Sequence, residues 1–196
     1  MTDTKTAMII SVGLDGHSLK GMSIERNLCN HCVRAKFCKH RKQLNKAERS
    51  SFGVQAPVAR CKKYVAPIVF RDTRGLDTRG QEVNTMRLGS AWAGRLHQGE
   101  LLGMFVEGKL YGLAEISKTP LAPSKSAALY CNAIDNHMLV DEKHALDRDT
   151  AGERLRKILI ANYGINRYEG VENLSVIYMH PVAHTKEEIK RVLSRI

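Results

Sequence analysis

The chain has 196 residues, which is enough for one domain of ordinary size or for one domain with a small metal-bound appendage. A hydrophobic content of 43% with only five prolines excludes a wholly disordered chain. The net charge of +11 favours polyanionic partners if it is concentrated in one region, and only a solvated surface if it is scattered.

The N-terminal part opens with one short apolar run. Ala7 to Gly13 predicts a buried strand that ends at the Asp15-Gly16 turn signal. The run is too short for a signal-peptide core or a membrane span, so we expect a cytoplasmic protein with no membrane partner. Thiols stay reduced in that compartment, and the five cysteines therefore indicate metal binding or burial rather than disulfides.

Positive charge is concentrated in the segment from Arg26 to Lys63. Eleven basic residues stand there against Glu48 as the single acid, and the rest of the chain is nearly neutral. A local field of this strength attracts phosphates and releases their counterions. The segment therefore predicts a nucleic-acid partner, with phosphate contacts expected from Arg34, Lys36, Lys39, Arg41, Lys42, Arg60, Lys62 and Lys63.

Four cysteines lie within the same segment. Cys29 and Cys32 form a Cys-x2-Cys pair, followed by Cys38 and then by Cys61. Such a pair places two thiolates on one tight turn, and two further soft ligands complete a tetrahedral zinc site. His40 could replace one cysteine as a ligand. The spacing also suits a [4Fe–4S] cluster held by four thiolates, so both Zn²⁺ and the cluster stay open. One or two helical turns are expected over 42–50.

The middle of the chain predicts two strands, a loop, a helix and a hairpin. Tyr64 to Phe70 has strand composition, and Pro67 within it favours a sheet edge. Residues 71–81 are polar and glycine-punctuated, which predicts an exposed loop. Residues 88–96, which include Trp92, suit a short helix. Two strands, 101–106 and 110–116, flank Glu107-Gly108-Lys109 as a hairpin.

The C-terminal third predicts three helices and one strand. Helices are expected over 126–138 and over 150–163, the second ended by Gly164. A strand is expected over 173–179, and a last helix over 185–196 begins with a Thr185-x-x-Glu188 capping box. Cys131 is expected to be a small core residue. The elements do not alternate regularly, which indicates an α+β fold around a small, mostly antiparallel barrel with flanking helices.

Residues from about 66 to 179 resemble the ASCH family of small β-barrel domains related to PUA RNA-binding modules. The stretches that carry the resemblance are Gly80 to Arg87, Leu88 to Trp92, Leu96 to Gly99 and Leu110 to Glu115. We therefore expect two parts, an N-terminal strand with the basic cysteine-rich metal-binding segment over 1–63 and an ASCH/PUA-like domain over 64–196. The resemblance implies a cleft beside the motif that binds nucleic acid or a nucleoside, and it favours RNA over DNA.

Some ASCH members resemble amidohydrolases in which a motif lysine and a threonine three residues later serve catalysis. The matching positions here are Glu82 and Thr85. A glutamate does not reproduce lysine chemistry unaided, so we expect binding rather than catalysis. A small hydrolase that acts on a modified nucleoside through Glu82, Thr85 and Glu115 stays as an alternative.

Two further expectations concern contacts. Arg87 is expected to meet a phosphate or a base edge, and Trp92 either stacks on a base or plugs the barrel core. A second alternative is an interaction module whose basic segment grips an acidic protein, such as a polymerase subunit.

Overall fold

We describe the protein from a computed structural model that places residues 32–33, 65–78 and 80–195. The strand expected over 7–13, the helical turns over 42–50, Cys29, Cys38, His40, Cys61 and the eight predicted phosphate-binding residues lie outside the described residues. The chain divides into two compact units, one of residues 1–67 with 190–196 and one of residues 68–189. In the first unit Cys32 is partly buried, and the Val33 amide donates to the Val65 carbonyl at 3.1 Å.

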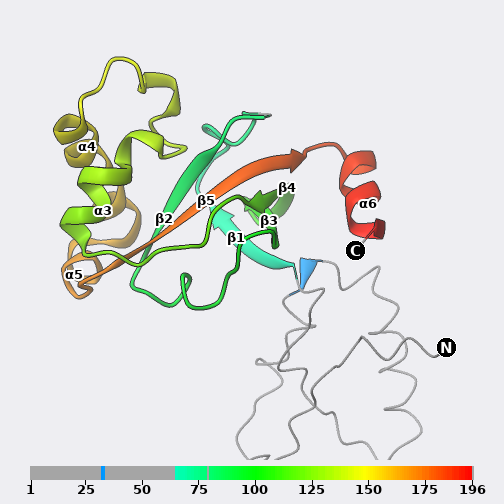
Figure 1. The fold of residues 1–196 in the computed structure, drawn as a ribbon, viewed down its shortest axis with the longest axis horizontal. Helices are drawn as coiled ribbons and strands as arrows, with labels where there is room; N and C mark the ends of the chain where they lie inside the picture. Colours follow the sequence, from blue (N-terminus) through cyan, green and yellow to red (C-terminus); the bar gives the residue numbers. More distant parts are fainter. Residues whose placement is uncertain (1–31, 34–64, 79, 196) are drawn as a thin grey trace, which may run out of the picture. The chain divides into compact units, whose positions relative to one another are not determined.

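The described strands form one curled sheet that resembles half of a barrel (Figure 1). Its order is β1-β3-β4-β5-β2, so β1 and β2 are its two edges. The pairs β3–β4, β4–β5 and β5–β2 are antiparallel. With its flanking helices, this sheet confirms the predicted α+β class and the barrel-like architecture. The strand bounds are Ala66–Phe70 (β1), Val83–Leu88 (β2), Leu101–Val106 (β3), Lys109–Ile116 (β4) and Leu174–Ala183 (β5).

The β3–β4 hairpin confirms the strongest strand prediction. Its two-residue turn, Glu107 and Gly108, has positive φ at both positions, +49° and +74°. That backbone twist matches the twist of antiparallel strands, and glycine adopts it without strain. The predicted edge strand after Tyr64 is also confirmed, because β1 lies at one end of the sheet order. Pro67 is compatible with that edge position.

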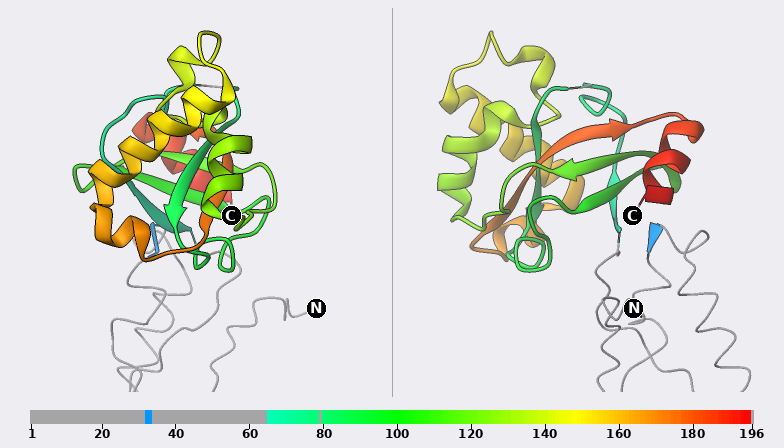
Figure 2. Two further views of the ribbon diagram at one scale, coloured as in Figure 1. Left: turned by 90° about the vertical axis from the view of Figure 1, so that its left-hand side faces the viewer. Right: turned by 45° about the vertical axis from the view of Figure 1, so that its right-hand side comes forward.

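The helices of the second unit gather beside β2 (Figures 1 and 2). Helix α4 follows the prediction closely, since the Asp147 side chain accepts from the Thr150 amide at 2.8 Å and Gly164 ends it with φ +84°. The predicted capping box also forms, with Thr185 and Glu188 exchanging hydrogen bonds of 3.1 and 3.2 Å. The bounds are Lys125–Asn132 (α3), Ala133–Asp135 (η4), Val140–Glu142 (η5), Arg148–Tyr163 (α4), Ile165–Glu169 (α5) and Lys186–Arg195 (α6).

One hydrophobic cluster joins these helices to the sheet. Leu129 of α3 and Leu155 of α4 pack with Met86 of β2 and Val176 of β5, all at most 9% exposed. Burying such a side chain contributes about 1.5 to 3 kcal/mol. The cluster therefore fixes the helical layer to the β2 side of the sheet and leaves the β3–β4 hairpin beyond it.

Two sequence predictions are wrong, and a third is wrong in part. The helix expected over 126–138 ends at Asn132, and the short helix η4 and residues 136–138 follow it. Residues 91–95 form successive turns instead of a helix, because Leu88 ends β2 and Gly89 at φ +75° redirects the chain. Cys131 is exposed on α3 rather than buried, since Ala128 and Leu129 form the face that packs inward. The strand β2 was not predicted, because its polar Asn84 and Thr85 are both buried and break the apolar alternation.

Candidate functional site

The open seam of the half-barrel lies between its two edge strands, and Arg87 bridges it. Arg87 of β2 donates from Nη2 to the Val69 carbonyl of β1 at 2.7 Å. Its guanidinium lies 5.0 Å from the centre of the Phe70 ring, and Nη1 reaches the Tyr163 hydroxyl at 3.4 Å. A hydrogen bond from a charged donor and a cation–π contact both stabilise this bridge. Arg87 therefore ties both strands to α4.

Residues 136–138 cover the seam next to this bridge. The Asn136 side chain donates to the Asn84 side chain at 3.0 Å, and the His137 amide donates to the Asn84 carbonyl at 2.9 Å. His137 Nδ1 lies 2.9 Å from the Arg74 carbonyl. Gly75 permits this approach, because a Cβ there would lie 2.0 Å from the His137 carbonyl oxygen. The 71–77 loop is thus held against the seam, with Leu76 fully buried.

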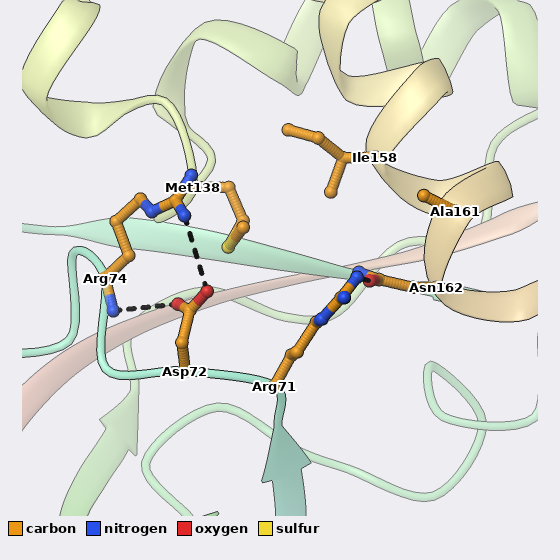
Figure 3. A pocket seen from close by; sticks show the side chains of 7 residues that line it. All are labelled: Arg71, Asp72, Arg74, Met138, Ile158, Ala161 and Asn162. Carbon is orange, nitrogen blue, oxygen red and sulfur yellow. Dashed lines mark hydrogen bonds and ion pairs between the residues drawn. The ribbon is translucent and has the colours of Figure 1, made fainter.

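A cleft of about 410 Å³ opens between this loop and α4 (Figure 3). Met138 and Ile158 line it with apolar side chains, and Arg71 and Arg74 line it with positively charged ones. An inner pocket of about 30 Å³ shares Arg71, Met138, Ile158 and Asn162 with the cleft. This inner pocket is also lined by Phe70, Thr85, Met86, Arg87, Asn136, His137, Leu155, Leu159 and Tyr163.

Positive charge in the cleft is only partly balanced. Arg74 pairs with Asp72 at 3.5 Å, and Arg71 Nη1 donates to the Asn162 side chain at 2.9 Å (Figure 3). Among the described residues no carboxylate forms an ion pair with Arg71 or Arg87. The cleft therefore has a surplus of cationic donors.

Two buried side chains complete the inner pocket. The Thr85 hydroxyl is shielded from solvent and has no hydrogen-bond partner, which is costly for a buried polar atom. Burial lowers the pKa of His137 to about 4, although its hydrogen bond to the Arg74 carbonyl acts in the opposite direction. The imidazole is therefore neutral at neutral pH. Its Nδ1 then carries the proton that it donates to Arg74.

Glu82 and Tyr178 face away from the Thr85 side chain and belong to a different polar cluster, which Ser117, Lys118, Asp135 and Lys143 complete. Glu82 forms an ion pair with Lys118 and accepts from the Ser117 hydroxyl at 2.6 Å. Lys118 lies 4.2 Å from the centre of the Tyr178 ring, whose hydroxyl bonds to Asp135 at 3.3 Å. Asp135 in turn accepts from Lys143 at 2.6 Å.

These contacts determine the ionisation of Glu82. Burial by itself would raise the pKa of its carboxyl group, but hydrogen bonds from Lys118 and Ser117 outweigh burial and hold the pKa below its ordinary value. Glu82 also raises the pKa of Lys118, mainly through their hydrogen bond. Both groups are therefore charged at neutral pH. We call this set of six side chains the compensated cluster, because each charge in it has an opposite partner.

The structure separates the predicted site residues. Thr85 and Arg87 meet in the inner pocket. Val83 and Ile116 both pair with Met179, so Glu82, which directly precedes β2, and Glu115, which precedes Ile116 in β4, face away from Thr85. Trp92 is partly buried in the 91–95 turns and does not line the cleft. Sequence reasoning missed Arg71, Arg74, Asn136, His137 and Asn162 as cleft residues, and no local signal marks them.

Comparison with known proteins found no matching family model, no matching curated protein and no matching solved structure. The ASCH resemblance therefore stays a prediction. Among the described residues no helix is long and apolar enough to cross a membrane. The described part of the chain also contains no group of three or more His, Cys, Asp or Glu side chains placed to hold a metal ion.

Proposed function

We propose that the protein binds nucleic acid, RNA in preference to DNA, through two separate parts. The basic segment 26–63 holds phosphates, and the cleft beside β2 receives a base or a nucleotide. One observation carries the proposal for the cleft: Arg71 and Arg87, which lack carboxylate partners among the described residues, line it together with the apolar side chains of Met138 and Ile158. A nucleotide needs this combination, because its base packs on apolar surface while its phosphate attracts guanidinium groups.

The preference for RNA rests on the ASCH resemblance of residues 66–179, which also implies a cleft beside the Gly80 to Arg87 motif. The cleft is formed partly by that motif, since Thr85 and Arg87 line its inner pocket. This agreement supports the proposal, and charge alone would not separate RNA from DNA.

Zinc is the second part of the proposal. Cys29, Cys32, Cys38 and Cys61 would hold Zn²⁺, with His40 as a substitute ligand and a [4Fe–4S] cluster as the alternative. The Val33–Val65 hydrogen bond supports it, because Val33 follows Cys32 directly and Cys61 precedes Val65 by four residues, at most about 14 Å of extended chain. Bound zinc would pin the basic segment in one conformation.

The hydrolase alternative has less support than binding. Thr85 faces the inner pocket, whereas Glu82 and Glu115 lie on the other face of the sheet. Glu82 is also held as a carboxylate by Lys118 and Ser117, which makes it a poor proton acceptor. A binding function needs neither residue in the cleft.

The test combines metal analysis with titration of the full chain by single-stranded RNA and DNA of one sequence. We expect one zinc per chain, tighter binding of RNA, and affinity that falls steeply as salt rises from about 50 to 200 mM. The double variant Cys29→Ser with Cys32→Ser should lose zinc and bind weakly. The control Cys131→Ser, at an exposed cysteine of α3, should keep both zinc and affinity.

Three results would overturn parts of the proposal. Absence of binding at low salt would contradict the nucleic-acid function, and capture of one acidic protein would then favour the interaction module. A brown sample that contains iron would replace zinc by the cluster. Retention of full RNA affinity by the metal-free double variant would remove the metal from the binding function.

A further inference from the structure

We propose that the inner pocket of the cleft binds a phosphate monoester, as found at the end of a nucleic-acid strand or on a free nucleotide. The inference rests on the proposed function for the rest of its ligand. The protein would then recognise the phosphorylated end of a nucleic-acid strand in addition to internal nucleotides.

The charge of the residues that line the inner pocket favours an anionic ligand. None of its thirteen lining residues is acidic, while Arg71 and Arg87 bring two positive charges. The nearest carboxylate in the cleft, Asp72, lines only the wider part and pairs with Arg74. Two cations without counter-ions around one pocket repel a cationic ligand and attract an anionic one.

Donors remain free for that anion. A guanidinium has five N–H groups, and Arg71 uses one of them on Asn162. Arg87 donates from Nη1 and Nη2 to the Val69 and Met86 carbonyls and the Tyr163 hydroxyl. At least one of its five N–H groups is still available for a ligand. The Thr85 hydroxyl has no hydrogen-bond partner and almost no accessible surface, so the pocket lining must shift before the hydroxyl donates to a phosphate oxygen. A ligand oxygen there would remove the cost of an unsatisfied buried group.

The volume of the inner pocket favours a terminal phosphate over a phosphodiester within a strand. The inner pocket, at about 30 Å³, has room for about two water-sized groups, which suits the terminal oxygens of one phosphate. The adjoining cleft, at about 410 Å³, lies in the range of small-ligand sites and suits the attached nucleoside. A phosphodiester inside the inner pocket would need an exit for its second ester group.

The experiment compares oligoribonucleotides of one sequence that carry a 5′-phosphate, a 3′-phosphate or only hydroxyl ends, with the full chain. One phosphorylated end should bind roughly 10-fold tighter than the hydroxyl ends, the scale of a hydrogen bond to a charged group. Nucleoside monophosphate and inorganic phosphate should compete for the same site, whereas the nucleoside should compete poorly.

Two variants assign the effect to the pocket. Thr85→Val removes only the hydroxyl and should fold normally, and Arg71→Gln removes a charge at the pocket rim. Each should reduce the preference for the phosphorylated end. Thr119→Val and Arg167→Gln change exposed side chains outside the cleft and should keep it.

The outcomes separate this inference from the proposed function. Equal binding of phosphorylated and hydroxyl ends by the wild-type chain would overturn the inference and leave nucleic-acid binding intact. Binding of nucleoside monophosphate without any binding of oligonucleotides would retain the inference and overturn the proposed function. A preference that survives in Thr85→Val and Arg71→Gln would place phosphate recognition elsewhere and would contradict the inference.

Discussion

The two faces of β2 differ in whether their charged and polar side chains have partners. On one face the compensated cluster pairs Glu82 with Lys118 and Asp135 with Lys143. On the other face Arg87 has only neutral partners, and the Thr85 hydroxyl has none. Satisfied polar networks hold a fold together, whereas a buried group without a partner costs stability that folding alone does not justify. This difference supports the proposal that the face of Thr85 and Arg87 receives a ligand, while the compensated cluster stabilises the fold.

Breaking the seam bridge should have the largest effect on stability. Arg87→Ala removes a charged hydrogen bond to Val69 and the contact with Phe70. We expect a loss of about 3 kcal/mol in the free energy of unfolding, measured by urea denaturation. Arg87→Lys should recover part of it. An unchanged unfolding midpoint in Arg87→Ala would show that the bridge does not hold the strands.

Lowering the pH should reduce the free energy of unfolding, because burial of His137 disfavours its protonated form. Its pKa of about 4 in the folded state lies below the ordinary value of 6.5, so the unfolded chain takes up the proton first as pH falls. The stability contribution is complete above about pH 6.5 and is lost towards pH 4, by up to about 3 kcal/mol. His137→Gln should flatten this part of the curve of unfolding free energy against pH. Parallel curves for both proteins would exclude His137 as the cause.

Disrupting the compensated cluster should cost less. Lys118→Gln leaves the Glu82 carboxylate without its cation, but both side chains are partly exposed and solvent replaces much of the pair. We expect a loss of about 1 kcal/mol in unfolding free energy with unchanged nucleic-acid affinity. Lys109→Gln, at an exposed position that begins β4, is the matched control and should change neither quantity.

The smallest expected effect has the opposite sign. Thr85→Val removes a buried hydroxyl that has no partner and keeps the shape of the side chain. We expect the unliganded protein to gain about 1 kcal/mol in unfolding free energy, while its affinity for a phosphorylated end falls. Thermal unfolding without and with nucleoside monophosphate measures both. Destabilisation of the unliganded variant would mean that the hydroxyl already has a partner.

The sequence predicted those elements whose signals are local. Helix α4 has an apolar stripe with Gly164 at its end, and α6 has the capping box from Thr185 to Glu188, so both were found within two residues. The β3–β4 hairpin had its turn signal at Glu107-Gly108. Strand β2 lacked any such signal, because Asn84 is buried through its bond to Asn136, 52 residues away.

The cleft was harder to predict than the strands, because its residues come from distant parts of the sequence. Thr85 and Arg87 were found through the ASCH resemblance, not through periodicity. The other cleft residues come from the 71–74 loop, residues 136–138 and α4, and only the folded chain brings them together. Nothing near Arg71 in the sequence indicates that its side chain will reach Asn162, 91 residues later.

The most direct test of the account compares Arg71→Gln with Lys118→Gln in two measurements, the affinity for a phosphorylated oligoribonucleotide and the unfolding midpoint in urea. We expect Arg71→Gln to lose affinity by roughly 10-fold and to keep its unfolding midpoint, because Arg71 has no carboxylate partner among the described residues. Lys118→Gln should keep its affinity and lose stability. Loss of affinity in Lys118→Gln together with full affinity in Arg71→Gln would place binding at the compensated cluster and contradict the proposed site.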